Sequence, residues 1–122
     1  MSNVNNKYDI YERIFNFIVE VLESVGKLPR TYSNQVITNQ ITRSVTSMGA
    51  NSQEADGASS RKDFLHCLTI TRKETKESIF WLRLIQKLNK NNEKVQNIIN
   101  EGQEINSIIS SIIKKTLENL KN

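Results

Sequence analysis

The segment FLHCLTITRKETKESIFWLRLI, residues 64–85, decides the fold class. Apolar and small residues recur along it at alternating steps of four and three, which places them on one face of an α-helix. These residues are Phe64, Leu68, Thr71, Thr75, Ser78, Leu82 and Ile85. Because threonine and serine are small, the middle of this stripe favours close approach of a neighbouring helix over bulky packing. The segment therefore predicts a long helix that buries one face.

Three further segments show the same helical period, over residues 11–25, 37–55 and 95–120. The apolar stripe of residues 37–55 is thin, and Ser44, Ser47, Ala50 and Ser52 fill its gaps, so this helix is expected to lie deepest against its neighbours. The predicted buried positions are Tyr11, Ile14, Phe15, Ile18, Val21, Leu22 and Val25 in the first, Ile37, Ile41, Val45, Met48 and Ala55 in the second, and Val95, Ile98, Gly102, Ile105, Ile109 and Ile112 in the last. Each set forms one face of an amphipathic helix.

Short connections separate the four predicted helices. Gly26 ends the first helix, Pro29 keeps the following stretch out of helix, and residues 89–92 form a turn. The candidate N-cap residues are Ser33 or Asn34 for the second helix and Ser59 or Ser60 for the third. Because short connections make successive helices antiparallel neighbours, we predict an all-α protein. Residues 1–122 form a single domain, an up-down-up-down four-helix bundle.

Composition excludes several other classes. The chain of 122 residues holds one proline and four glycines, too few turn signals for a many-stranded β fold. A single cysteine, Cys67, rules out an intramolecular disulfide and a cysteine-based zinc site. No apolar run reaches the length of a membrane span, and residues 1–6 lack the apolar stretch of a secretory signal. We therefore expect a reduced, soluble, cytoplasmic protein without a cofactor.

Positive charge gathers in one third of the chain. Residues 58–90 contain eight basic and three acidic residues, a balance of +5, whereas the whole chain carries +4. The basic residues predicted to contact phosphates are Arg61, Lys62, Arg72, Lys73, Lys76, Arg83 and Lys87. Several lie at helical spacings that place them on one outward side, so they form a candidate footprint for a nucleic-acid backbone. The alternative is an ordinary solvated face, partly neutralised by Glu74 and Glu77.

The last predicted helix has more isoleucine residues than are needed to fill two core positions in each heptad. Its five closely spaced isoleucines are Ile105, Ile108, Ile109, Ile112 and Ile113. Burial of part of this surface against another copy of the chain would remove an exposed apolar patch, so we predict a homo-oligomer. The alternative is that all five residues face the core of one bundle.

The sequence offers little to a catalytic hypothesis. A di-metal site in a helical bundle uses inward carboxylates with two Glu-x-x-His pairs, but His66 is the only histidine. His66 and Cys67 are adjacent and point about 100° apart on a helix, so they cannot pair. Arg43 lies one step from the apolar seam of its helix, and it is expected to form structural ion pairs with carboxylates. The candidate partners are Glu54, Glu74 and Glu77.

Residues 40–84 resemble a known family of four-helix bundles. That family includes the 23S rRNA intervening-sequence proteins and the accessory variability proteins of diversity-generating retroelements. The resemblance is carried by Gln40, Arg43, Ser44, Ser47, Asn51, Glu54 and Ala55, then by Ser60, Arg61 and Phe64, and then by Glu74, Glu77, Trp81 and Leu82. Thr71 and Thr75 depart from it, since alanine is frequent there. The resemblance implies a cytoplasmic bundle, homopentameric in some members, with a link to nucleic acid or to a reverse transcriptase.

Three functional hypotheses follow from these observations. The first is a non-enzymatic homo-oligomeric bundle whose basic surface binds the backbone of RNA or DNA; the resemblance implies that the oligomer is a pentamer. The second is a protein-interaction scaffold, for example for a reverse transcriptase, without direct nucleic-acid contact. A metal-dependent enzyme that uses Glu54, Glu74 and Glu77 ranks third.

Overall fold

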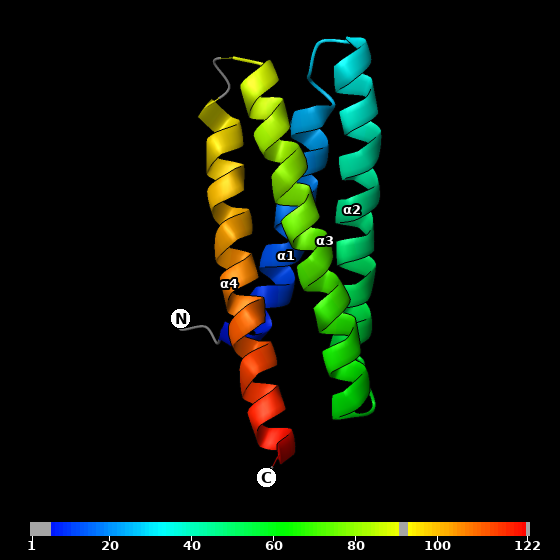
Figure 1. Ribbon diagram of the computed structural model, residues 1–122, viewed down its shortest axis with the longest axis vertical. Coiled ribbons are helices and arrows are strands. Elements are labelled where there is room, and N and C mark those ends of the chain that lie inside the picture. Colours follow the sequence, from blue (N-terminus) through cyan, green and yellow to red (C-terminus); the bar gives the residue numbers. More distant parts are fainter. Residues whose placement is uncertain (1–5, 91–92, 122) are drawn as a thin grey trace.

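Four long helices form the whole of the described structure. The computed structural model describes residues 6–90 and 93–121. Its helices are α1 (Asn6–Val25), α2 (Tyr32–Asp56), α3 (Arg61–Leu88) and α4 (Glu93–Lys121). Successive helices run in opposite directions, and α3 lies in front of α1 in the view of Figure 1. Each helix packs against two neighbours: α2 against α1 and α3, and α4 against α3 and α1. The predicted all-α four-helix bundle is confirmed.

The buried face of α1 differs from the predicted one. Phe15, expected in the core, is 61% exposed, whereas Phe17 is 1% exposed and among the largest fully buried side chains. The buried stripe is Ile10, Ile14, Phe17, Val21 and Val25. On a helix with about 100° per residue, this stripe is rotated by about 60° from the predicted one. Apolar residues cover more than half of α1, so its periodicity alone does not fix which part faces inward.

The contact between α2 and α3 is built from small hydroxyl side chains. Ser44 and Ser78 are fully buried, and their Oγ atoms lie 2.8 Å apart. Thr71 and Thr75 are also buried, and each hydroxyl donates a hydrogen bond to the carbonyl four residues earlier. Because these hydroxyls are satisfied by their own helix, they can be buried without the cost of an unpaired polar group. The predicted thin stripe therefore brings the two backbones close together, as expected.

The helix starts only partly follow the predicted caps. Ser60 caps α3, since its side chain accepts a hydrogen bond from the backbone N–H of Asp63. The cap of α2 is Thr31, rather than Ser33 or Asn34. The buried Asn34 side chain instead donates to the Pro29 carbonyl at 2.9 Å and hydrogen-bonds the Asn89 side chain. That bond ties the start of α2 to the end of α3.

The isoleucines of α4 are largely used by the bundle core. Ile105, Ile109 and Ile113 are buried, and Ile108 and Ile112 are half-buried. The turn of the helix brings three of the five residues inward, so the surplus at these positions is limited to the partly exposed Ile108 and Ile112. Ile112, which is predicted to be buried, is half-buried, and the neighbouring Ile113 is buried in its place. Exposed apolar side chains lie elsewhere: Phe15, Val19, Tyr32, Val36, Phe80, Leu88, Leu117 and Leu120.

Candidate nucleic-acid interface

The seven predicted phosphate contacts share the outer face of α3. At about 100° per residue, they fall within an arc of about 120°, opposite the buried stripe. They are Arg61, Lys62, Arg72, Lys73, Lys76, Arg83 and Lys87. Six are exposed; Arg72 is half-buried and donates to the Ser110 hydroxyl at 3.5 Å. We call these seven residues the cationic face. With about 1.5 Å of rise per residue, it extends for about 40 Å.

Negative charge on α3 is turned away from the cationic face and towards α2. Arg43 donates a hydrogen bond to Glu77 Oε2, which also accepts one from Trp81 Nε1 at 3.2 Å. Arg43 Nη1 lies 3.6 Å from Glu74 Oε1, and Ser47 Oγ lies 3.3 Å from Glu74 Oε2. The two carboxylates that were expected to dilute the basic charge are therefore engaged by Arg43. Within the described residues, no member of the cationic face forms an ion pair.

Glu74 is the most buried charged residue of this network, at 8% exposure. The 3.6 Å separation from Arg43 is an ion pair without a hydrogen bond, so Glu74 Oε1 has no donor among the described residues. Glu54, the third expected partner, is exposed and takes no part in the network. That expectation is wrong because Glu54 lies eleven residues beyond Arg43, about 16 Å along the helix, outside the reach of the arginine side chain.

Two features of the site were not predicted. Arg13 on α1 donates two hydrogen bonds to Glu101 on α4, at 2.9 and 2.7 Å, and a third to Glu104. Phe80 is half exposed in the middle of the cationic face, at three or four residues from Lys76 and Arg83. The signal for Phe80 was present in the sequence, since the stripe that predicts the buried face of α3 leaves this aromatic residue outside.

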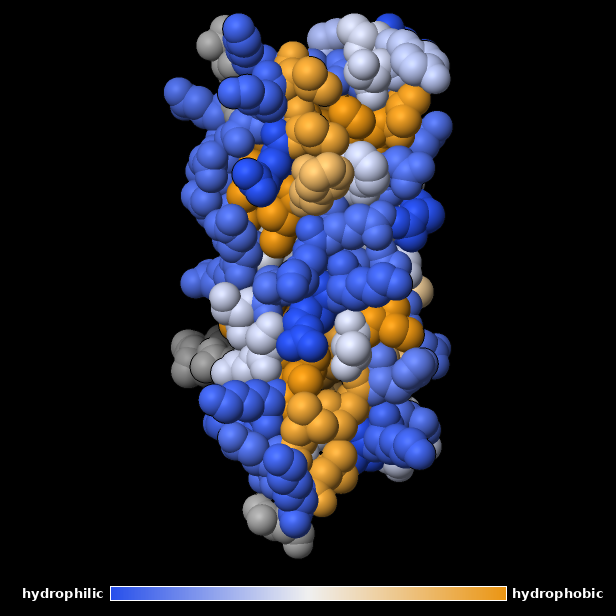
Figure 2. Space-filling model, viewed as in Figure 1, coloured by the Kyte–Doolittle hydropathy of each residue, from blue (hydrophilic) through white to orange (hydrophobic). Residues whose placement is uncertain are grey.

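The view with α3 in front shows how these features combine. Hydrophilic surface covers much of this side, and apolar patches interrupt it near both ends of the bundle (Figure 2). A groove of about 710 Å³ lies over the second half of α3 and is lined by Phe80, Leu84 and Gln86 together with Arg83, Lys87 and Lys90. The candidate interface is therefore both basic and partly apolar.

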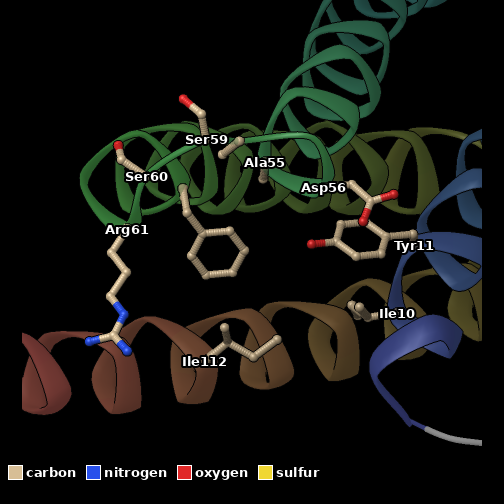
Figure 3. A pocket seen from close by; sticks show the side chains of 10 residues that line it. Ile10, Tyr11, Ala55, Asp56, Ser59, Ser60, Arg61 and Ile112 are labelled. Atoms are coloured by element: carbon tan, nitrogen blue, oxygen red, sulfur yellow. The ribbon is translucent and has the colours of Figure 1, made fainter.

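A separate cavity of about 550 Å³ lies at one end of the bundle. Figure 3 shows Tyr11 beside Asp56 at one end and Arg61 at the other, with the side chain of Ile112 rising from α4 between them. Burial raises the pKa of the Tyr11 phenol, and the negative charge of Asp56 raises it further. The cavity thus has an acidic end and a basic end with apolar walls, and Arg61 belongs to both the cavity and the cationic face.

The residues that could support catalysis are dispersed. His66 is exposed and Cys67 is half-buried on adjacent positions of α3. Over residues 6–90 and 93–121, no three histidine, cysteine, aspartate or glutamate side chains gather as a metal site would require. The same ranges contain no helix with both the length and the apolar character of a membrane span.

The fold and the site define a class of protein: a small four-helix bundle with a cationic outer helix and an arginine–glutamate network behind it. Comparison with family models makes the assignment specific. Residues 6–111 match the model of the 23S rRNA-intervening sequence protein family, and the chain belongs to that family. The resemblance of residues 40–84 to the 23S rRNA intervening-sequence proteins is confirmed.

A solved structure supports the same assignment. A protein of unknown function from the S23 ribosomal protein family of Bacteroides thetaiotaomicron VPI-5482 is 35% identical to this chain, with a TM-score of 0.79. The similarity covers 88% of this chain and 96% of that one. Among curated proteins, no match is found. The fold and the family are thus shown.

Proposed function

We propose that this chain is a non-enzymatic helical bundle that binds RNA, with the cationic face of α3 in contact with backbone phosphates. The observation that carries the proposal is the separation of charge on α3. Six of the seven residues of the cationic face are exposed, none of the seven forms an ion pair within the described ranges, and Glu74 and Glu77 are held by Arg43. Such a surface positions a nucleic-acid backbone but does not read base sequence. RNA is favoured over DNA by the family to which the chain belongs.

The binding energy of such an interface comes mainly from the release of counterions. A protein that neutralises six to ten phosphates loses about a thousandfold or more in affinity between about 50 and 200 mM salt. The seven residues of the cationic face, spread over about 40 Å, fall in this range. We therefore expect steep salt dependence.

A titration of a fluorescent RNA at about 50 and about 200 mM salt tests the proposal. Lys73→Glu with Lys76→Glu reverses two charges at the centre of the face, and is expected to weaken binding at least about tenfold and to flatten the salt dependence. Lys27→Glu with Arg30→Glu is the matched control, because it makes the same change in net charge in the α1–α2 connection. Absence of binding by the wild type at low salt, or equal losses in both double variants, would refute the proposal.

We also propose that the bundle self-associates in the cytoplasm, as a pentamer by resemblance to members of its family. The support comes from apolar side chains left at the surface, such as Leu117 and Leu120 on α4. Burial of such surface between copies would stabilise an assembly by about 25 cal/mol per Å². A ring would also multiply weak phosphate contacts. Mass measurement by light scattering tests this, and a monomer at all concentrations would refute it.

The competing function is that of a protein-interaction scaffold, for example for a reverse transcriptase. It is favoured by a second group of exposed apolar residues, Tyr32, Val36 and Leu88. The Asn34–Asn89 hydrogen bond places the start of α2 beside the end of α3, so these residues lie at the same end of the bundle. Retention of a purified protein partner by a chain that binds no RNA at low salt would favour this function.

A further inference from the structure

The exposed aromatic ring on α3 occupies an unusual position. Phe80 is 50% exposed, although the same helix buries its apolar residues on the opposite side. One side of its ring contacts Trp81 in an edge arrangement, with ring centroids 4.9 Å apart and planes at 69°. Trp81 is itself fixed, since its Nε1 donates to Glu77, which Arg43 also binds. The ring of Phe80 therefore packs on one side against a fixed Trp81 and lines the groove of α3.

Cations surround this ring along the helix axis. Lys76 precedes Phe80 by four residues and Arg83 follows it by three, so both are its neighbours on the helix surface. Lys73 and Lys87 lie one turn further in each direction. An apolar protein segment docked on Phe80 would have to desolvate these four charges, which is costly unless each is paired. A ligand that offers an aromatic face between two negative charges avoids that cost.

We propose that Phe80 stacks on an unpaired base of single-stranded RNA, while Lys76 and Arg83 contact the phosphates on either side of that base. This inference rests on the proposed function and adds the form of the nucleic acid. The faces of a base are covered by its neighbours in a duplex, so a protein ring can reach one only where the strand is open. Stacking of bases on aromatic side chains within a basic groove is a general means of binding single strands.

The position of α3 in the bundle argues against duplex recognition. A helix reads duplex DNA by entering the major groove, which is about 12 Å wide. Here α2 and α4 pack along both sides of α3, so the helix does not project far enough to enter (Figure 1). In duplex RNA the major groove is too deep and narrow for side chains to read. The cationic face can therefore touch a duplex only along its phosphates, with Phe80 unused.

The test compares variants of two exposed phenylalanines. Phe80→Ala is expected to weaken binding of a single-stranded RNA of about 12 nucleotides by about tenfold, with the salt dependence unchanged because no charge is altered. Phe15→Ala, which removes a similarly exposed ring on α1, is the matched control and is expected to bind as the wild type does. Phe80→Trp should retain binding. Phe80→Leu should lose as much as Phe80→Ala, because leucine keeps the apolar surface but offers no aromatic face.

The outcomes separate this inference from the proposed function. If the wild type shows no salt-dependent RNA binding, the proposed function itself fails. If binding is salt-dependent and sensitive to Lys73→Glu with Lys76→Glu, but Phe80→Ala binds as the wild type does, only the stacking inference is overturned. Equal loss in Phe80→Ala for single-stranded and blunt duplex RNA, or retained binding in Phe80→Leu, would also overturn it. A fall in molecular mass with unchanged RNA binding in Phe80→Ala would assign the ring to a protein contact instead.

Discussion

The contact between α2 and α3 and the contact between α1 and α4 hold the same bundle together in different ways. Between α2 and α3, small hydroxyl side chains meet directly, with 2.8 Å between the Oγ atoms of Ser44 and Ser78. Between α1 and α4, a large ring fills the space left by a missing side chain. A Cβ added at Gly102 would lie only 3.1 Å from Phe17 Cε1. The α2–α3 contact is tightly packed because the two helices lie close together, and the α1–α4 contact is tightly packed because a large side chain fills the space between them.

The two contacts also differ in their ion pairs. Arg43 binds Glu77 and the buried Glu74 across α2 and α3. Arg13 binds Glu101 and Glu104 across α1 and α4, where both carboxylates are more accessible to water than Glu74, although Arg13 itself is less exposed than Arg43. The difference has a functional consequence, because only the Arg43 network removes acidic charge from the helix that carries the cationic face. The contact between α2 and α3 is therefore both a packing device and part of the electrostatics of the candidate interface.

The largest effect is expected from loss of the Phe17 ring, which fills the contact between α1 and α4. Phe17→Ala should lower the free energy of unfolding by about 3–5 kcal/mol, since it removes a fully buried ring and leaves a cavity against Gly102. Phe15→Ala, on the exposed side of the same helix, should change it by less than about 0.5 kcal/mol. Urea unfolding followed by circular dichroism measures both. Similar losses in the two variants would show that the orientation of α1 is wrong.

These two phenylalanines also show where sequence reasoning reached its limit. On α3 most apolar residues lie opposite the basic ones, so the heptad predicts six of the buried positions, and only Phe64 of the predicted stripe is half-buried. On α1 the apolar residues extend over both Phe15 and Phe17, and the choice between them depends on the gap at Gly102 in another helix. The α2 start was ambiguous for a local reason, because Thr31, Ser33 and Asn34 are all good capping residues. The hydrophobic period of one segment shows neither how its side chains fit the neighbouring helix nor which of several capping residues is used.

The candidate site was predictable to a similar extent. Helical spacing alone places the seven cations on one side of α3. It does not reveal that Glu74 and Glu77 are held by Arg43, because the order and handedness of the neighbouring helices decide which edge of α3 faces α2. It also left Phe80 without a role, since an exposed aromatic residue has meaning only beside the charges that surround it.

The next largest effect is expected at the contact between α2 and α3, where the two helices lie close together. Ser78→Leu should destabilise the fold by about 1–3 kcal/mol, because the larger side chain forces apart two helices that meet at hydroxyl distance. Ser78→Ala should cost less than about 1 kcal/mol, since Ser44 keeps its hydrogen bond to the Ile41 carbonyl. Unfolding free energies of the two variants decide the point. A Ser78→Leu variant as stable as the wild type would mean that the space between α2 and α3 can accommodate a larger side chain.

A smaller difference is expected between the two ion-pair networks. Arg43→Met leaves the buried Glu74 without a cation and should cost about 1–2 kcal/mol, and adding Glu74→Leu should recover much of that loss. Arg13→Met leaves Glu101 and Glu104 without their cation, but water reaches both carboxylates more easily than it reaches Glu74, so the change should cost less than about 1 kcal/mol. A double-mutant cycle for each network measures the coupling. Equal costs for the two arginines would contradict the assigned difference in burial.

The smallest effect concerns pH and the cavity at the end of the bundle where α1 faces α2. Burial, and then the charge of Asp56, raises the pKa of Tyr11, so the folded chain holds the phenolic proton more tightly than the unfolded chain does. The resulting stability is present below about pH 10, the ordinary range of tyrosine, and is lost as the pH rises through the folded pKa. Tyr11→Phe does not titrate there, so the wild type should lose more stability than this variant between about pH 8 and 11.

Urea unfolding at the two pH values measures that difference, and Tyr32→Phe, which removes an exposed phenol, is the matched control. Lysines also titrate in this range, but they are common to all the variants and cancel in the comparison. Asp56→Asn should reduce the alkaline loss only in part, because burial is the larger cause of the shift. If Tyr11→Phe and the wild type lose stability in parallel, the phenol is hydrated in the folded chain. The cavity would then be open to water at its acidic end, where Tyr11 lies beside Asp56.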